Sequence, residues 1–228
     1  MTQPVNLLEA RNVSKYFGGL AAVDGVDFTL QGGGIHAIIG PNGAGKTTFV
    51  SLLCGRLDCT DGSIRFLNQD ITGLPAWQRV QRGIAYTFQI TSIYPRLSVF
   101  DNVAIAAQGV HLGEKGGQAA VNSILDRVGL VALAETTAGT LAYGHQRLLE
   151  VGMGLALSPR LLILDEPTQG LSDSEINDFC DLVRNIANDA TVLLIEHNMR
   201  VVMELAHTIT VFDHGRILTR GEPAAVRA

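Results

Sequence analysis

The sequence has few of the features that mark disulfide-stabilised or membrane-spanning chains. Only three cysteines occur in 228 residues, at Cys54, Cys59 and Cys180, and none forms a CxxC pair. An odd number of cysteines without motif spacing indicates reduced thiols in a cytosolic protein rather than a disulfide framework. The longest stretch without charge, residues 28–45, contains Gln, His, Asn, Pro and several glycines. Since a membrane-spanning helix needs about 20 mostly apolar residues, we predict no span.

Positive charge is scarce as well. The 17 basic and 22 acidic side chains give a formal net charge of −5, and no dense run of Lys or Arg stands out. Binding to a nucleic-acid backbone usually needs a clustered basic surface. The N-terminal sequence MTQPVNLLEA also lacks the basic start and apolar core of a signal peptide. We therefore expect a cytoplasmic protein with no nucleic-acid partner.

The apolar pattern predicts one α/β domain over residues 1–228. The runs IHAII, LLILD and TVLLI are apolar throughout, which is typical of parallel strands covered on both faces. Earlier strands are interrupted by polar residues and connected through QGGG, so we expect a small antiparallel layer of short strands. From about residue 90 to residue 160 the pattern is mostly helical, which predicts a helical lobe inserted into the α/β core. The expected helices are Lys46–Gly55, Ala76–Gln81, Val99–Ala107, Gln118–Val128, Gln146–Leu157, Asp173–Asn188 and Met199–Ala206.

One glycine-rich segment carries a strong chemical signal. IHAIIGPNGAGKTTFVSLL places a strand, a glycine loop and a helix in order and matches G-x-x-x-x-G-K-[ST]. Glycines let backbone N–H groups wrap phosphates, and the helix N-terminus adds the positive end of its dipole. We expect Lys46 to reach the terminal phosphates and the Thr47 hydroxyl to coordinate Mg²⁺. The predicted phosphate-binding residues are Gly40, Pro41, Asn42, Gly43, Ala44, Gly45, Lys46, Thr47 and Thr48.

The segment LLILDEP predicts the rest of a hydrolytic site. Its apolar strand leaves Asp165 at the carboxyl end, where ligands bind in open α/β sheets. Asp165 is suited to the Mg²⁺ shell, and Glu166 to orienting an attacking water. An acidic pair after a strand is by itself more often a helix cap or a solvated turn, so this assignment depends on the phosphate loop. No Asn-Lys-x-Asp motif is present, which disfavours a GTPase.

Further motifs follow one another in a characteristic order. Gln89 ends IAYTFQ, LAYGHQ precedes a helix, GLSD follows the acidic pair, and His197 ends TVLLIEH. With Phe17 in KYFGG, these motifs make the whole chain resemble the nucleotide-binding subunit of an ABC transporter. FGGLAAVDGVDF, YTFQ, LAYG and IEHNM resemble the subgroup that serves branched-chain amino-acid importers, although the chain ends at GEPAAVRA, earlier than we expect.

The resemblance implies a fold and several residue roles. The fold is a RecA-like P-loop NTPase core with an antiparallel β subdomain and an inserted helical signature subdomain. Phe17 corresponds to the aromatic residue that stacks on adenine, with Tyr16 as the competing choice. Gln89 corresponds to the residue that contacts Mg²⁺ or the attacking water, and His197 to the switch histidine at the γ-phosphate. The implied catalytic residues are Glu166, His197 and Gln89, and the implied metal ligands are Thr47, Gln89 and Asp165.

The signature segment departs from the family pattern. That pattern is commonly Leu-Ser-Gly-Gly-Gln, whereas here Ala142 replaces the serine, Tyr143 the first glycine and His145 the glutamine, with Gly144 retained. The resemblance implies a head-to-tail dimer in which these residues contact ATP on the opposite chain. Ser172 stands where the family commonly has Asp, which puts the role of that loop across the dimer in doubt.

The implied function is ATP hydrolysis that powers import of a small polar or amino-acid-like solute. The implied partners are integral membrane permease subunits, a second ATPase subunit (a copy or a paralogue) and a periplasmic or extracellular solute-binding protein. The chain is then peripheral on the inner face of the membrane, and Gln89–Val103 receives a helix of the permease. One alternative is an ABC-class ATPase acting on the ribosome or DNA, although such proteins usually have two ATP domains or coiled-coil arms. Another, suggested by the altered signature, is a non-hydrolysing regulatory module.

Overall fold

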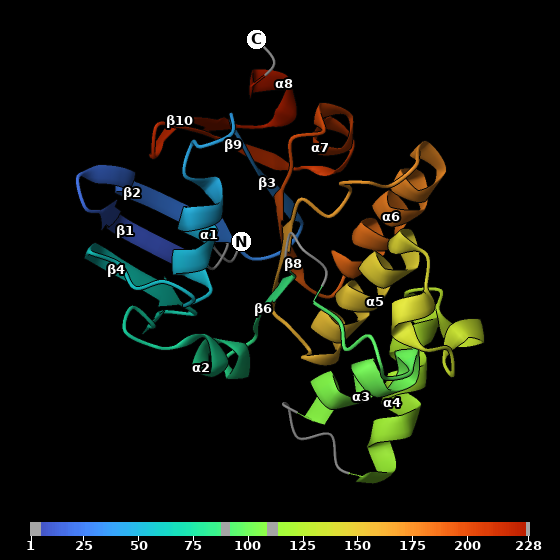
Figure 1. Cartoon of the computed structure of the whole chain (residues 1–228). Helices are drawn as coiled ribbons and strands as arrows, with labels where there is room; N and C mark the ends of the chain where they lie inside the picture. Colours follow the sequence, from blue (N-terminus) through green and yellow to red (C-terminus); the bar gives the residue numbers. More distant parts are fainter. Residues whose placement is uncertain (1–5, 88–91, 109–113, 227–228) are drawn as a thin grey trace, which may run out of the picture.

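Two β-sheets form the framework of the chain, and the computed structural model describes residues 6–87, 92–108 and 114–226 (Figure 1). A six-stranded sheet has the order β10-β9-β3-β8-β7-β6. Its strands are β3 (Ile35–Ile39), β6 (Ile84–Thr87), β7 (Leu161–Asp165), β8 (Thr191–Ile195), β9 (Thr208–Asp213) and β10 (Arg216–Gly221). Strands β3, β8 and β7 are parallel neighbours, so the prediction of buried parallel strands is confirmed.

The second sheet is antiparallel, with the order β2-β1-β4-β5. It consists of β1 (Asn6–Phe17), β2 (Leu20–Gln31), β4 (Asp61–Phe66) and β5 (Gln69–Asp70). The predicted antiparallel layer is confirmed. The predicted strand runs LLEARNVSKYF and AAVDGVDFTL fall within β1 and β2, although with 12 residues each these strands are not short. Register shifts such as the one between Ala10 and Val13 absorb the polar interruptions that suggested shorter strands.

The helices surround the larger sheet (Figure 1). They are α1 (Lys46–Leu53), α2 (Ala76–Gln81), α3 (Val99–Gln108), α4 (Glu114–Arg127), α5 (Tyr143–Ala156), α6 (Asp173–Ile186), α7 (Met199–Leu205) and α8 (Pro223–Val226), with 3-10 turns at Val131–Leu133 and Ala138–Thr140. Helix α5 begins three residues before the predicted start at Gln146. Gly144 lowers the local helix propensity, but it is buried against the neighbouring segment, and tertiary packing outweighs the propensity.

Alternate residues of the central strands face two different cores. Leu162 and Leu164 of β7 pack with helices α3–α6, whereas Leu161 and Ile163 pack between the two sheets. Helix α1 lies in that second core. Its Phe49 meets Phe28 of β2 edge to face, with 5.4 Å between ring centroids. The helix that follows the phosphate loop is therefore held by both sheets.

A buried arginine fixes the other end of α1. The last carbonyls of a helix have no partner within it. Arg79 of α2 is 1% exposed, and its guanidinium donates to the carbonyl oxygens of Leu52 at 2.7 Å and Leu53 at 2.9 Å. Its Nη2 donates to the carbonyl oxygen of Thr72, and its Nε donates to that of Leu74. These bonds set the position of α1, and with it that of the loop at its start.

The described cysteines are all free, which confirms the prediction that they form no disulfide framework. Burial raises the pKa of the Cys54 thiol to about 11 and that of Cys180 to about 11, so both remain protonated at neutral pH. Among the residues that the structure describes, no helix combines the length and apolar character needed to cross a bilayer.

Candidate functional site

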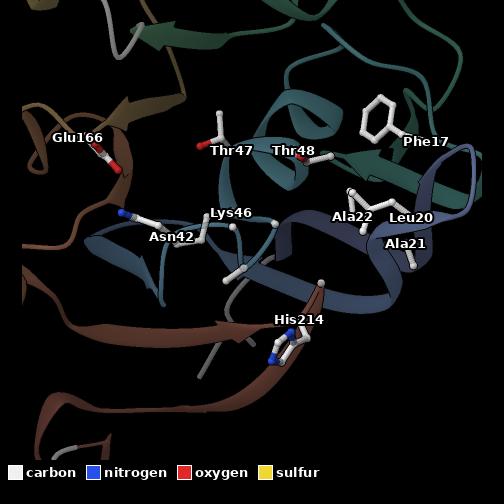
Figure 2. Close-up of a pocket in the computed structure, with 14 residues that line it drawn as sticks. Phe17, Leu20, Ala21, Ala22, Asn42, Lys46, Thr47, Thr48, Glu166 and His214 are labelled. Carbon is white, nitrogen blue, oxygen red and sulfur yellow. The ribbon is translucent and has the colours of Figure 1, made fainter.

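A pocket of about 470 Å³ opens beside the loop between β3 and α1 (Figure 2). Figure 2 shows Phe17 at one end of the pocket and Glu166 at the other, with Thr47 and Thr48 between them. The structure thus brings together predicted residues from three separate segments: Phe17, residues 42–48 and Glu166. The lining residues are Phe17, Leu20, Ala21, Ala22, Asn42, Gly43, Ala44, Gly45, Lys46, Thr47, Thr48, Glu166, His214 and Gly215.

Two glycines of the loop are required by its backbone path. Gly40 has φ 148° and Gly45 has φ 96°, conformations that L-amino acids with a side chain rarely adopt. A Cβ on Gly40 would overlap the carbonyl oxygen of Phe212, and one on Gly45 would overlap that of Ala22. The loop therefore packs tightly on β9 and β2.

Lys46 is held in place by the loop itself. Its side chain is 6% exposed, and Nζ donates to the carbonyl oxygens of Gly40 at 2.7 Å and Pro41 at 2.9 Å. Burial lowers the pKa of Lys46, while the negative charges of Glu166 and Asp165 act in the opposite direction. A cation in this position compensates the charge of a phosphate at the loop.

Asp165 has the features of a metal ligand. It is 1% exposed, and its Oδ2 accepts a hydrogen bond of 2.7 Å from the Tyr86 hydroxyl, whereas its buried Oδ1 has no hydrogen-bond partner. Burial raises the pKa of this carboxyl, and the bond from Tyr86 opposes that change. An unpaired buried carboxylate oxygen is costly unless a cation or water satisfies it. The Asp165 carboxylate and the exposed Thr47 hydroxyl both offer oxygen atoms as ligands. This set of donors fits Mg²⁺, which prefers oxygen ligands.

The next residue, Glu166, has a strained backbone. Its φ is 47°, in the left-handed region, and its N–H donates to the carbonyl oxygen of Ile195 at 2.9 Å. Such strain is held by surrounding structure and often occurs at functional sites. Oε1 of Glu166 lies 3.7 Å from Nδ1 of His197, with the two side chains 13% and 54% exposed. The structure therefore brings the predicted water-orienting carboxylate and the predicted switch histidine together.

The aromatic end of the pocket favours Phe17 over Tyr16. Phe17 lines the pocket and is 47% exposed, so its face is accessible to a planar base. Tyr16 does not line it and instead donates its hydroxyl to Asp24 at 3.2 Å. His214, in the turn between β9 and β10, also lines the pocket. Sequence reasoning missed His214 because no motif marks that turn.

The signature residues lie away from this pocket. In Figure 1, α5 stands on the far side of β8 from α1. Ala142 is the N-cap of α5 without a side-chain cap, and Tyr143 is 43% exposed. Gly144 and His145 line a separate cavity of about 100 Å³ between α5 and α6. The four signature residues are thus not part of the phosphate pocket of their own chain.

Gly144 has a structural role within the chain. It is buried, and a Cβ at this position would overlap Oε1 of Glu175. The other oxygen of Glu175 accepts hydrogen bonds from the N–H of Ser172 at 2.8 Å and from its hydroxyl at 2.7 Å, which completes a capping box at the start of α6. Ser172, a departure from the family pattern, is therefore an effective helix cap. A side chain at position 144 would therefore require the Glu175 carboxylate to shift.

Gln89 lies outside the described residues, so its predicted contacts stay a prediction. Sequence reasoning missed Tyr86, although a hydroxyl in the buried strand IAYT was a signal that it needed a partner. It also missed Glu196, an acidic residue that directly follows the apolar strand TVLLI and is fully buried.

We expect Gly144→Ala to lower the free energy of unfolding by about 0.5–1 kcal/mol, because its Cβ displaces the exposed Glu175 carboxylate from the capping box of α6. In a Glu175→Ala background the same change should cost less than about 0.5 kcal/mol, because the overlapping carboxylate is gone. Urea unfolding of the four proteins measures this coupling. Gly152→Ala in the same helix is the control, because its Cβ would meet neighbours only at 3.4 Å or more. An equal cost of Gly144→Ala in both backgrounds would show that Glu175 is not the constraint.

The chain is similar to known ATP-binding proteins of transporters. A family model described as ABC transporter matches residues 23–169. The chain is 35% identical to BraF of Pseudomonas aeruginosa, a high-affinity branched-chain amino acid transport ATP-binding protein, over 100% of this chain and 95% of BraF. It is 33% identical to RbsA of Rhodococcus jostii, a ribose import ATP-binding protein, over 97% of this chain and 45% of RbsA. The ADP conformation of MJ1267, an ATP-binding cassette of an ABC transporter, matches with a TM-score of 0.86 and 28% identity, over 95% of this chain and 91% of that one. The chain belongs to the ABC transporter family, in which it is an ATPase subunit.

Proposed function

We propose that this ATPase subunit powers import of a small polar solute of the branched-chain amino-acid type. The observation that carries the proposal is the pocket that joins the phosphate loop to Glu166, whose carboxylate lies 3.7 Å from His197, in a chain that aligns over its full length with BraF. The likeness to RbsA makes a sugar the competing cargo. Specificity for either solute belongs to the membrane and solute-binding partners.

The phosphate end of the pocket binds and orients ATP. The N–H groups of residues 42–48 and the ammonium of Lys46 surround the β- and γ-phosphates, and the adenine stacks on Phe17. When bound, Mg²⁺ supplies charge neutralisation at the phosphoryl oxygens, and Thr47, Asp165 and Gln89 would hold it. The Tyr86 hydroxyl donates a hydrogen bond to Oδ2 of Asp165. The other oxygen, Oδ1, is therefore available for the metal or its water.

Glu166 orients the water that attacks the γ-phosphorus. The carboxylate accepts a hydrogen bond from that water, whose oxygen then bonds to phosphorus while the bond to the β-phosphate oxygen breaks. His197, 3.7 Å from Glu166, donates a hydrogen bond to a γ-phosphate oxygen and stabilises the charge that develops there. ADP and phosphate are the products. This arrangement argues against a non-hydrolysing module, because both catalytic groups are present and adjacent.

A second ATPase subunit supplies the signature to each pocket. Ala142, Tyr143, Gly144 and His145 lie outside the pocket of their own chain, so they contact ATP only across a head-to-tail dimer of copies or paralogues. The start of α5 presents N–H groups to the γ-phosphate of the opposite chain. Ala142 lacks the hydroxyl that serine supplies there, and that loss weakens closure of the dimer.

The remaining partners follow from the transport function. Permease subunits receive the chain on the cytoplasmic face of the membrane, and a solute-binding protein delivers the solute from outside. We place the permease contact at residues 89–103, of which 92–103 are described. Tyr94 in this segment is 50% exposed, and its backbone is fixed by Asn102, whose side chain accepts from the Tyr94 N–H at 2.7 Å. An aromatic side chain on a rigid loop suits a protein interface.

We expect Glu166→Gln to bind ATP with a dissociation constant within about twofold of the parent and to hydrolyse it about 10²–10⁴ times more slowly, because the amide orients water poorly. The dimer should accumulate in ATP. Phosphate release and size-exclusion chromatography measure these effects. Glu135→Gln, the same chemical change at an exposed residue outside the pocket, is the control. Parental turnover by a monomeric Glu166→Gln protein would contradict the assignment.

We expect Tyr86→Phe to raise the Mg²⁺ concentration for half-maximal ATPase activity by about tenfold. Partners that orient a metal ligand typically contribute 10–100-fold to metal affinity, and this change removes the donor that fixes the Asp165 carboxylate. The control is Tyr16→Phe, which also removes a hydroxyl bonded to an aspartate, Asp24, but outside the pocket. Identical Mg²⁺ titrations for Tyr86→Phe and the parent would show that Asp165 does not act through this bond.

The transport proposal is tested with the tagged chain expressed in the organism that encodes it. We expect integral membrane proteins to co-purify, and the complex in proteoliposomes to take up radiolabelled leucine, isoleucine or valine only with ATP. A complex that carries Glu166→Gln should take up none. Uptake of ribose without amino-acid uptake would replace the cargo assignment. Co-purification with ribosomes or DNA and no membrane protein would favour the alternative of a ribosome- or DNA-directed ATPase.

A further inference from the structure

Glu196 is a fully buried carboxylate next to the catalytic groups that has no place in the hydrolytic scheme above. It follows the last residue of β8 and directly precedes His197, with 0% of its surface exposed. It does not line the ATP pocket. A buried carboxylate is costly unless hydrogen bonds satisfy it, so its contacts indicate what it contributes.

Four donors converge on this carboxylate. Oε1 accepts from the N–H of Thr168 at 3.1 Å and from the hydroxyl of the same residue. Oε2 accepts from the N–H of His197 at 2.9 Å and from that of Asn198 at 3.0 Å. An ionised carboxylate offers about four lone-pair sites, and these donors use them. Glu196 is therefore saturated as an acceptor and is unsuited to proton transfer.

The two segments that Glu196 joins carry the two proposed catalytic side chains. Thr168 lies two residues after Glu166, and the N–H of His197 donates directly to the Glu196 carboxylate. A second bond between the same segments, from the Glu166 N–H to the carbonyl oxygen of Ile195 at 2.9 Å, fixes the opposite side of this connection. Glu166 keeps its left-handed backbone between these two attachments. These contacts thus hold together the backbones of the two loops whose side chains, Glu166 and His197, lie 3.7 Å apart.

We propose that Glu196 is a positioning residue for ATP hydrolysis, which sets the spacing of Glu166 and His197 through its bridge between Thr168 and the backbone of residues 197–198. The proposal rests on the catalytic roles proposed above for Glu166 and His197. Charge-assisted bonds from backbone N–H groups are stronger than neutral ones, so a carboxylate holds both loops more firmly than a neutral side chain. Misplacement of a catalytic group by about 1 Å can reduce turnover about 10²-fold.

The first test is Glu196→Gln, which keeps the size of the side chain but has one acceptor oxygen. Its NH₂ group must face either Thr168 or the two N–H groups of residues 197–198. Facing Thr168, it can donate to the hydroxyl oxygen but opposes the Thr168 N–H, so at least one of the four accepted bonds is lost in either orientation. We expect kcat to fall about 10–100-fold, while the dissociation constant for MgATP stays within about twofold because Lys46 and the loop are untouched. A change in kcat without a change in binding separates positioning from general loss of structure.

The second test uses Thr168→Val, which removes the hydroxyl donor on the other side of the bridge and keeps the shape of the side chain. It should lower kcat in the same way, and the double variant with Glu196→Gln should be no slower than the worse single variant, because both changes break one bridge. Thr168→Val also keeps the proposal testable if Glu196→Gln does not fold. Val192→Ala is the control, since it weakens packing in β8 at the end of the strand remote from the site and should leave kcat unchanged.

Three results would overturn the proposal. One is parental kcat in folded Glu196→Gln or Thr168→Val protein, and another is multiplication of the two losses in the double variant. The third is an equal loss of kcat in Val192→Ala at matched thermal stability. Glu166→Gln is measured in parallel: if it retains parental turnover, the proposed catalytic scheme fails, whereas a slow Glu166→Gln with a fast Glu196→Gln rejects only the positioning role.

Discussion

The chemistry of this protein depends on three parallel strands that end at the same level. In the sheet, Ile38 of β3 is level with Ile195 of β8, and Ile195 is level with Asp165 of β7. Each strand is followed within two residues by a group of the site: Gly40 after β3, Glu166 after β7, and Glu196 and His197 after β8. Carboxyl ends of adjacent parallel strands are only about 5 Å apart, so residues distant in sequence meet at that edge.

The register at this edge explains which parts of the site could be predicted from the sequence. The phosphate loop and the acidic pair were predictable because their chemistry imposes both residue type and spacing on one continuous segment. His197 needed the resemblance to a family, since a histidine after a strand has no unique meaning. Tyr86 and Glu196 could not be found in this way, because their partners, Asp165 and Thr168, belong to another strand or loop and only the register places them together.

The same limit applies to the fold. Continuous apolar runs correctly predicted β3, β7 and β8 because both faces of these strands are buried. The early start of α5 was missed, since Gly144 interrupts the helical pattern and its compensation, packing on Glu175, is a tertiary contact. The register shifts in the pairing of β1 could not be predicted either, because they depend on its neighbour β2. In each case a contact distant in sequence outweighed the local preference.

The signature segment is connected to the catalytic edge of its own chain by one short segment, residues 166–175. Glu196 fixes this segment at Thr168, and further along, Gly170 lies against the ring of Tyr143, where a Cβ would be 3.0 Å from the ring. Tyr143 in turn accepts a hydrogen bond from Arg147 at 3.1 Å, which secures it on α5. At the end of the segment, Glu175 packs on Gly144. Direct contacts therefore link the segment that carries Glu166 to the start of α5.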